Sequence, residues 1–323
     1  MIKRTHTCGG LRSKDIGNTI SLNGWISKSR DLGGLHFIDL RDRYGKTQIV
    51  FNEDIKKDTF DRVKKLGLED VIGITGKVVA RPEDAVNKKI PTGEIDVEVT
   101  ELTIYNESAP PPFDINDRNS ASEDHRLKYR YLELRTKELQ HNMLIRHKAA
   151  IATRNFMNDQ DFVEIETPVL MKSTPEGARD FLVPSRLHTG RFYALPQSPQ
   201  TYKQLLMVSG FDKYFQIVKC FRDEDFRADR QPEFTQIDIE MSFVDQDDII
   251  KLGTDLTRHI WKIVNDVDLP EEFPILNYHD AMERYGSDKP DIRFDMELQE
   301  MAGFVEKSDF NTFKSVLESG GRV

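Results

Sequence analysis

Hydrophobic and polar residues alternate in five short runs along the first hundred residues, a pattern typical of β-strands. Turn-forming residues such as Gly33 and Gly34 separate the runs, and a polar stretch with helical spacing, residues 52–65, follows the third run. The predicted strands are Thr19–Ile26, Leu35–Leu40, Lys46–Phe51, Val71–Val79 and Ile95–Ile104.

Five strands with a helix between the third and the fourth favour an OB-fold, a barrel whose sheet face binds single-stranded nucleic acid. Three consecutive prolines, Pro110 to Pro112, come after the last strand. Prolines remove backbone donors and force an extended path, so this segment separates the barrel from a second folding unit.

The second unit mixes helices and strands, and the chain as a whole is therefore predicted to be α+β. Helical spacing of apolar residues alternates with strand-like runs. The predicted elements are a helix over Leu139–Asn158, a strand over Phe162–Glu166, a strand entering a turn near Phe192, a helix after Pro199, strands over Lys213–Phe221 and Thr235–Phe243, a helix over Asp248–Val264, a strand turning into a helix over Pro274–Met282, and a further strand and helix within residues 294–323.

A long, charged loop joins the strands ending at Phe221 and starting near Thr235, whereas ordinary hairpin loops have two to five residues. Three arginines, Arg222, Arg227 and Arg230, lie in this loop among carboxylates. Composition alone leaves a solvated surface loop and an anion-binding loop equally open. The next strand favours a pocket, because it places a polar row on one face, consisting of Gln236, Asp238, Glu240 and Ser242.

Composition places the chain among ordinary globular proteins, with 38% hydrophobic and 31% charged residues in 323. No apolar run approaches a membrane span, and the two distant cysteines suggest neither a disulfide framework nor a zinc site, so we expect a cytoplasmic protein. The net charge is −9, but residues 1–110 hold 18 Lys and Arg against 17 Asp and Glu. The N-terminal part is therefore the less repulsive surface for a nucleic-acid backbone.

The charged loop and the strand after it resemble motif 2 of the class II aminoacyl-tRNA synthetases, most closely the bacterial-type aspartyl-tRNA synthetases. The matching residues are Phe221-Arg222-Asp223-Glu224 and Arg230-Gln231-Pro232-Glu233-Phe234-Thr235-Gln236-Ile237-Asp238-Ile239-Glu240-Met241. The resemblance implies that Arg222 is a catalytic residue that holds the ATP α-phosphate, that Glu224 lies near the adenine, and that Phe234 stacks on it. Asp223 and Gln231 belong to the same implied ATP site.

Two further segments resemble the family's amino-acid site, namely the Ser-, Thr- and Gly-containing loop 172–181 and the turn and helix over residues 196–204. The implied aspartate site comprises Glu176, Ser198, Gln200, Lys203, Arg222 and Asp238. Glu176 and Asp238 are implied to hold the ammonium group, and Lys203 to pair with the side-chain carboxylate. The family usually has Leu-Phe where this chain has Thr201-Tyr202, which leaves the implied contacts intact.

Substrate choice depends on Lys203, because aspartate and asparagine differ little in volume. A buried ammonium group that faces a neutral amide would be an under-compensated charge, which could support discrimination of about a thousandfold. The segment Tyr285-Gly286-Ser287-Asp288-Lys289-Pro290-Asp291 also resembles the aspartyl type and not the lysyl or asparaginyl types.

The resemblance extends to the barrel, where Gly24-Trp25-Ile26 and Gln48-Ile49-Val50-Phe51 are similar to an anticodon-binding domain. It implies that Phe37 stacks on an anticodon base, that Gln48 reads another, and that Arg30 and Glu83 contribute further contacts. The strand pattern by itself favours the opposite placement of Phe37, in the barrel core.

Class II motif 1 is resembled by the predicted helix over Leu139–Asn158, the strand over Phe162–Glu166 and Pro168 after it. This resemblance implies a homodimer. Motif 3 and the expected Mg²⁺ ligands find no match, so we expect this chain alone to be inactive, with no metal site of its own. The predicted organisation is an OB-fold anticodon-binding domain at 1–108, a linker at 109–133, a catalytic domain at 134–290, and the start of an insertion domain at 291–323.

The implied reaction joins L-aspartate to ATP, giving aspartyl-adenylate and pyrophosphate, and then transfers aspartate to tRNA(Asp). Two alternatives stay open. One is a nucleic-acid-binding fragment or paralogue without ligase activity, and the other is an asparaginyl or lysyl ligase of the same architecture.

Overall fold

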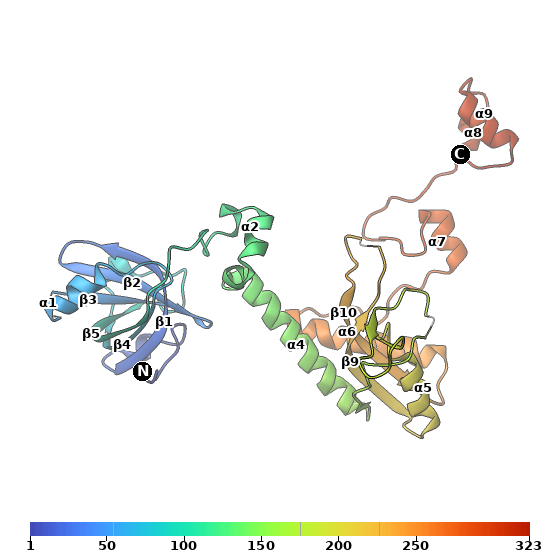
Figure 1. Ribbon diagram of the computed structural model, residues 1–323. Coiled ribbons are helices and arrows are strands. Elements are labelled where there is room, and N and C mark those ends of the chain that lie inside the picture. Colours follow the sequence, from blue (N-terminus) through green and yellow to red (C-terminus); the bar gives the residue numbers. More distant parts are fainter. Residues whose placement is uncertain (54, 175, 226) are drawn as a thin grey trace. The chain divides into compact units, whose positions relative to one another are not determined.

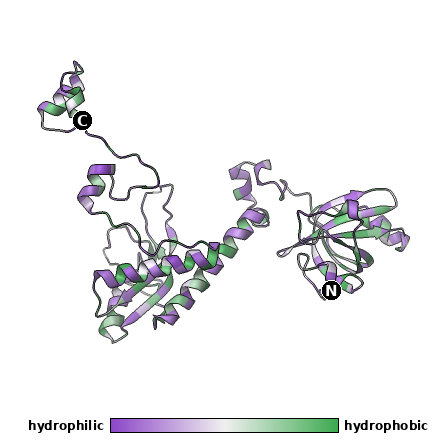
Figure 2. Ribbon diagram, turned by 180° about the vertical axis from the view of Figure 1, so that it is seen from behind, coloured by the Kyte–Doolittle hydropathy of each residue, from purple (hydrophilic) through white to green (hydrophobic). Residues whose placement is uncertain are grey.

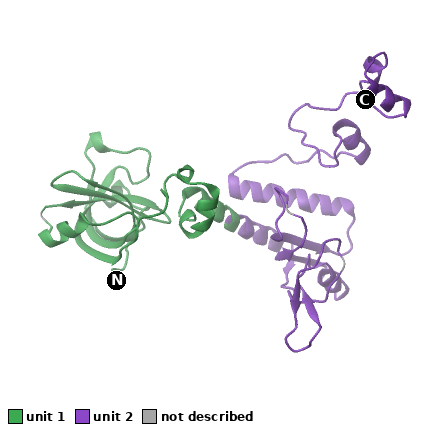
Figure 3. Ribbon diagram, turned by 45° about the horizontal axis from the view of Figure 1, so that its top comes forward, with its two compact units in different colours: residues 1–147 green, residues 148–323 purple. Residues whose placement is uncertain are grey.

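The computed structural model describes residues 1–53, 55–174, 176–225 and 227–323. The chain forms two compact units, Met1–His147 and Lys148–Val323 (Figure 3). The division falls within one long helix, α4 (Lys137–Asp159).

Five strands close into a barrel in the first unit (Figure 1). They follow the order β1-β2-β3-β5-β4, and every neighbouring pair is antiparallel except β3 and β5, which run parallel. The strands are β1 (Thr19–Asp31), β2 (Leu35–Asp42), β3 (Gly45–Asn52), β4 (Val71–Ala80) and β5 (Ile95–Asn106), with helix α1 (Lys57–Val63) between β3 and β4. This arrangement confirms the OB-fold prediction, although α1 occupies only part of the predicted 52–65 stretch, in which position 54 lies outside the described residues.

The barrel interior is filled by branched aliphatic side chains, and both colours of the hydropathy scale occur along its strands (Figure 2). On β2, His36, Ile38 and Leu40 point inward and are buried, whereas Phe37 between them is half-buried and absent from the core cluster. The core placement that the strand pattern favoured for Phe37 is therefore wrong. Its neighbours occupy the inward positions of the alternation, so Phe37 must lie on the outer face.

Barrel closure depends on one close backbone approach in β4. A Cβ atom at Gly76 would lie 2.4 Å from the carbonyl oxygen of Glu98 on β5, at the point where the register between the two strands shifts. Only glycine fits there without displacing the partner backbone.

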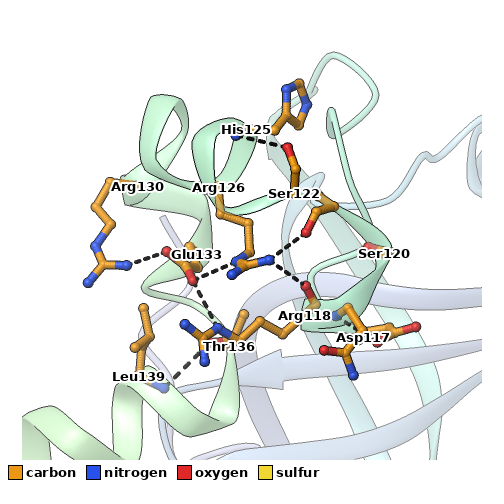
Figure 4. A network of polar contacts seen from close by, with 12 residues as sticks. Asp117, Arg118, Ser120, Ser122, His125, Arg126, Arg130, Glu133, Thr136 and Leu139 are labelled. Carbon is orange, nitrogen blue, oxygen red and sulfur yellow. Dashed lines mark hydrogen bonds and ion pairs between the residues drawn. The ribbon is translucent and has the colours of Figure 1, made fainter. Parts of the chain in front are cut away.

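A short helical segment follows the barrel within the first unit. It contains η3 (Arg118–Ser120), α2 (Glu123–Lys128) and α3 (Arg130–Glu133). At the centre of this segment the carboxylate of Glu133, 1% exposed, accepts hydrogen bonds from Arg118, Arg126 and Arg130 (Figure 4). Two other 3-10 turns, η1 (Ser13–Asp15) and η2 (Glu83–Ala85), flank barrel strands.

The second unit contains a three-stranded sheet in the order β10-β9-β6, where β9 and β10 are antiparallel and β6 runs parallel to β9. Its elements are β6 (Val163–Glu164), β7 (Leu182–Pro184), β8 (Phe192–Ala194), α5 (Gln200–Val208), β9 (Lys213–Phe221), β10 (Glu233–Met241), α6 (Gln246–Asn265), α7 (Tyr278–Tyr285), α8 (Ala302–Val305) and α9 (Asn311–Glu318). Strands β7 and β8 form a separate hairpin.

Two predicted strands do not form. Residues 274–277 are irregular before α7 begins, and residues 294–301 are irregular before α8. Ile275 is 80% exposed and Met296 is 78% exposed, so these apolar runs have no partner strand among the described residues that would bury them.

Opposite faces of the sheet have opposite character. Phe215 of β9 lies across from Ile239 of β10, and both pack with Leu256 of α6 in one hydrophobic cluster. The residues one position away, Gln216 and Asp238, are also paired across the strands and face the other side, where α5 lies. Helix α4 contributes Phe156 and Met157 to the same cluster, so α4 and α6 cover the apolar face, while the polar face remains available for a site.

Candidate functional site

Strand alternation gathers the predicted site residues on the polar face of the sheet. Arg222 follows the last residue of β9 at the same parity as Gln216, and Phe234 shares the parity of Asp238 on β10. The backbone N–H of Arg222 donates to the carbonyl of Pro232 at 2.8 Å, which continues the ladder into the long loop. Residues that the sequence placed in separate roles therefore lie along one surface.

Arg222 and Phe234 contact each other at one end of this surface. The guanidinium carbon of Arg222 lies 5.1 Å from the centroid of the Phe234 ring, a cation–π distance. Both line a cavity of about 360 Å³, together with Glu224, Asp225, Asp229, Arg230, Gln231 and Pro232. The cavity brings together four of the five predicted ATP-site residues, all except Asp223, whose backbone is held nearby by Arg179.

The two arginines of the cavity differ in whether a carboxylate pairs with them. Arg230 forms an ion pair with Glu224 at 3.2 Å. Within the part of the chain that the structure describes, no carboxylate pairs with Arg222. Arg222 is therefore the cation in this cavity that can meet an incoming anion.

Lys203 of α5 lies over the middle of the polar face with its side chain only 12% exposed. Its Nζ atom is 3.1 Å from Oδ1 of Asp238 and 3.3 Å from Oε2 of Glu240. The prediction that treated Lys203 as a cation awaiting a carboxylate was incomplete, because two carboxylates already balance it. Glu240 belongs to the polar row that the sequence showed, but its role as a partner of Lys203 emerges only when α5 packs on the sheet.

Asp238 has an unsatisfied oxygen in this cluster. Its Oδ1 atom accepts from Lys203, whereas Oδ2 is buried without a hydrogen-bond donor among the described residues. Burial raises the pKa of Asp238, and the ammonium group of Lys203 together with the nearby Tyr214 hydroxyl opposes the shift without cancelling it. A buried carboxylate oxygen without a donor is costly, so this atom marks a position that a cationic ligand group could fill.

Neighbouring polar side chains hold the sheet face rigid beside Asp238. Oε1 of Gln216 accepts hydrogen bonds from the hydroxyls of Thr167 at 3.0 Å and Tyr214 at 2.9 Å. All three side chains are buried.

Cys220, further along β9, is also buried, and burial together with Asp238 raises its pKa to about 11, which keeps it a thiol at neutral pH.

Glu176 and Ser198, both members of the implied aspartate site, contact each other. The Ser198 hydroxyl donates to Oε2 of Glu176 at 2.7 Å and accepts from the backbone N–H of Gln200 at 3.3 Å. Gln200 is the first residue of α5, one turn before Lys203. Pro199 serves as the N-cap of this helix, which agrees with the helix predicted after it.

The barrel brings three of its four predicted residues together. Arg30 donates to Oε1 of Gln48 at 2.7 Å and to Oδ1 of Asp39 at 3.2 Å, and Phe37 is paired with Arg30 across β1 and β2. Glu83 lies apart from them in sequence and element, exposed in the turn η2.

Asp96 and Arg81 extend this cluster and were missed from the sequence. The parallel register of β3 and β5 places Asp96 beside Gln48, and Nε of Arg81 donates to Oδ1 of Asp96 at 2.7 Å. Burial raises the pKa of Asp96, while its bonds to Arg81 and Gln48 pull the pKa down. Asp96 lies between the core residues Ile95 and Val97 and therefore on the outer face of β5, but the pairing of β3 with β5 that brings it to Gln48 cannot be read from spacing.

Among residues 1–53, 55–174, 176–225 and 227–323, no group of three or more His, Cys, Asp or Glu side chains could hold a metal ion. The described residues thus do not form a Mg²⁺ site. No helix in the described ranges is long and apolar enough to span a membrane.

Comparison with known proteins agrees with this geometry. Residues 122–314 match the family described as tRNA synthetases class II (D, K and N), and residues 20–105 match the OB-fold nucleic acid binding domain. The chain belongs to the class II tRNA synthetases of the D, K and N group. The OB-fold match confirms the predicted nature of the barrel.

Relatives of this class II synthetase chain include proteins named as aspartate–tRNA ligases. It is 54% identical over 322 residues to the aspartate–tRNA(Asp/Asn) ligase of Caldanaerobacter subterraneus subsp. tengcongensis, and 54% identical over 324 residues to the aspartate–tRNA ligase of Staphylococcus carnosus. All of this chain is covered in both comparisons, but only 54% and 55% of the relatives. The chain spans about half the length of the curated relatives it matches.

Solved structures share the fold of this synthetase chain. The asparaginyl-tRNA synthetase of Pyrococcus horikoshii complexed with asparaginyl-adenylate superposes with a TM-score of 0.73 at 25% identity, over 83% of this chain and 59% of that one. The aspartyl tRNA synthetase of Entamoeba histolytica gives 0.67 at 24% identity, over 79% and 53%.

Proposed function

We propose that the protein carrying this chain is an aspartate–tRNA ligase that forms aspartyl-adenylate from L-aspartate and ATP and then esterifies tRNA(Asp). The observation that carries this proposal is the pairing of Lys203 with Asp238, whose second oxygen is buried without a donor in the part of the chain that the structure describes. A cation and an unsatisfied carboxylate side by side match an amino acid that bears both an ammonium group and a side-chain carboxylate.

Aspartate would bind this cluster by exchanging ion pairs. Its side-chain carboxylate replaces Asp238 as the partner of Lys203, and its ammonium group then lies between Asp238 and Glu176, so every charge keeps a partner. Asparagine would supply the ammonium group but leave Lys203 with Glu240 alone. The penalty is smaller than for a wholly unpaired lysine, but it has the same sign.

ATP would occupy the adjoining cavity, with its α-phosphate on Arg222 and its adenine on Phe234. The α-carboxylate of aspartate attacks the α-phosphorus of ATP, the bond from this phosphorus to the oxygen bridging it to the β-phosphate breaks, and pyrophosphate leaves. Arg222 stabilises the charge that develops on the phosphate, and the catalytic effect is positioning with electrostatic stabilisation. Asp223, Glu224 and Gln231 are proposed as further ATP contacts, and use of Mg²⁺ rests on the resemblance alone.

The barrel is proposed to bind the tRNA anticodon through the outer face that carries Arg30, Phe37 and Gln48. A half-buried aromatic ring beside a guanidinium group suits base stacking, and this exposure supports the proposal. Glu83 is kept as a proposed contact on the resemblance alone. The domain limits 1–108, 109–133, 134–290 and 291–323 are likewise proposed.

A homodimer through α4 is proposed because this helix exposes apolar side chains. Met143 is 58% exposed, Leu144 is 42% exposed and Ile151 is 44% exposed.

A cytoplasmic location is proposed because the two cysteines, Cys8 and Cys220, are free and buried, as is usual in reducing compartments.

Amino-acid-dependent ATP–pyrophosphate exchange by the full-length protein tests the proposed function. We expect exchange with aspartate and a kcat/KM at least about a hundredfold lower with asparagine, which corresponds to about 2.7 kcal/mol. Equal exchange with both amino acids would refute the role of Lys203. Absence of exchange with aspartate, with tRNA binding retained, would favour the nucleic-acid-binding alternative.

A further inference from the structure

Gln197 is a buried amide that the proposed reaction does not use. It lies between β8 and α5, directly before Ser198, and is 3% exposed. Its Oε1 atom accepts from the backbone N–H of Ala178 at 3.1 Å, and its Nε2 atom donates to the carbonyl of the same residue at 2.9 Å. Nε2 also donates to Oδ1 of Asp180 at 2.5 Å.

These three bonds use the amide oxygen and both amide hydrogens of Gln197. Bonds to the N–H and the C=O of one residue fix that residue in both position and orientation, as a paired strand would. The loop it fixes contains Gly177 at φ 105°, so local backbone preference does not hold this segment in place. Ser173 closes the base of the loop by donating to Asp180 at 2.5 Å.

The fixed segment carries Glu176, a proposed ligand of the amino-acid ammonium group. Glu176 lies two residues before Ala178, and its carboxylate accepts from Ser198, the neighbour of Gln197. The far end of the segment reaches the arginine-rich loop, where the backbone N–H of Asp223 donates to the carbonyl of Arg179 at 3.1 Å. Gln197 thus holds the loop between two anchors, one beside the amino acid and one beside ATP.

We propose that Gln197 is a positioning residue for the amino-acid site. Its three hydrogen bonds, here called the latch, hold residues 176–180 in place so that Glu176 can bind the substrate ammonium group. The inference rests on the proposed function for its kinetic consequence, but the latch itself is a property of this chain. Arg222 and Phe234 are carried by the sheet and not by the loop, so loss of the latch should affect aspartate more than ATP.

Gln197→Glu tests the latch with almost no change in size. The new carboxylate keeps an acceptor for Ala178 N–H but opposes the Ala178 carbonyl and Asp180 with negative charge. We expect the KM for aspartate in pyrophosphate exchange to rise about 10- to 100-fold, since small misplacements of a binding group have effects of this order. We expect the KM for ATP to change less than about threefold, because Arg222 and Phe234 lie beside the ends of β9 and β10 and outside residues 176–180.

Three further variants separate a positioning role from general destabilisation. Gln160→Glu makes the same chemical change at an exposed site of the same unit and should leave both KM values unchanged. Asp180→Ala removes one latch contact from the loop side and should raise the KM for aspartate by a smaller factor. Adding Asp180→Asn to Gln197→Glu returns a donor to the new carboxylate and should recover part of the loss.

Amide hydrogen exchange of residues 176–180 supplies a readout independent of activity. We expect faster exchange in Gln197→Glu and Asp180→Ala than in the wild type, with strands β9 and β10 unchanged. Unchanged loop exchange and an unchanged KM for aspartate would overturn the latch. Equal rises in both KM values without rescue by Asp180→Asn would also overturn it, whereas an inactive wild type with a protected loop would refute only the proposed ligase function.

Discussion

At the scale of single residues, the site depends on polar atoms that burial leaves with few alternatives. Lys203, Asp238 and Glu240 carry a net charge of −1 in a largely buried cluster, and one oxygen of Asp238 has no donor among the described residues. A buried negative charge with an unsatisfied oxygen destabilises the fold until a cationic group binds it. The arrangement therefore suits ligand binding better than it stabilises the protein.

Acidification should weaken aspartate binding through Asp238. Burial raises the pKa of this carboxyl group, so it takes up a proton at a higher pH than an ordinary aspartate, and the neutral form cannot pair with an ammonium group. The KM for aspartate in pyrophosphate exchange should rise as pH falls through this pKa. In Asp238→Asn the KM should be high and lack this inflection; an inflection that persists would assign the titration to another group.

Phe37→Ala should weaken tRNA binding without changing aspartate activation. A stacked base contributes about 1–3 kcal/mol, so the tRNA dissociation constant should rise about tenfold or more in a filter-binding or fluorescence titration. Tyr44→Ala, which removes another exposed aromatic ring of the barrel, is the matched control. Parallel losses in tRNA binding and in pyrophosphate exchange would mean that Phe37 stabilises the fold instead.

At the scale of elements, a single carboxylate organises the helical segment after the barrel. Arg118 comes from η3, Arg126 from α2 and Arg130 from α3, and all three donate to Glu133 (Figure 4). Burial alone would raise the pKa of Glu133, but the three hydrogen bonds outweigh it and lower the pKa. These short helices have little intrinsic stability, so the charge cluster and a small hydrophobic cluster that includes Phe113 and Leu132 hold them together.

Glu133→Gln should reduce the free energy of unfolding by about 2 kcal/mol at neutral pH, the order of hydrogen bonds to charged groups. The pKa of Glu133 is lower in the folded state, so its stabilisation is complete above the ordinary glutamate pKa of about 4.3 and is lost as pH falls through the folded value. Thermal unfolding of both chains against pH measures this. Curves that differ by the same amount at pH 7 and pH 3 would contradict an ionic role.

At the scale of the whole molecule, each of the two units has its own hydrophobic core. The barrel buries most of its aliphatic residues, whereas the second unit exposes many, among them Phe243 at 95% and Ile237 at 43%. The second unit therefore offers apolar surface that association with other protein surface could cover.

Ile151→Lys should shift the proposed homodimer to monomers. A charged side chain on the exposed apolar stripe of α4 would be desolvated without a partner in the interface. Light scattering after gel filtration of the full-length protein measures the shift. Leu187→Lys, at a site 81% exposed outside α4, should leave the dimer intact, and dimers that persist in Ile151→Lys would place the interface elsewhere.

Sequence periodicity determined most of the strands and helices of this protein, because alternation and helical spacing are properties of neighbouring residues in the chain. It predicted the five barrel strands, the hairpin of β9 and β10, and the polar row containing Asp238, and motif resemblance supplied Arg222, Phe234 and Lys203. It overestimated strands where apolar runs at 274 and 294 have no partner.

Only the tertiary structure decided what depends on contacts between distant segments. The parallel pairing of β3 with β5 brings Asp96 to Gln48, the packing of α5 on the sheet gives Lys203 two carboxylates, and the loop before β7 folds back onto Gln197. The register of nonadjacent strands and the docking of loops are set by packing across the fold, and such contacts leave no periodic signal in the chain.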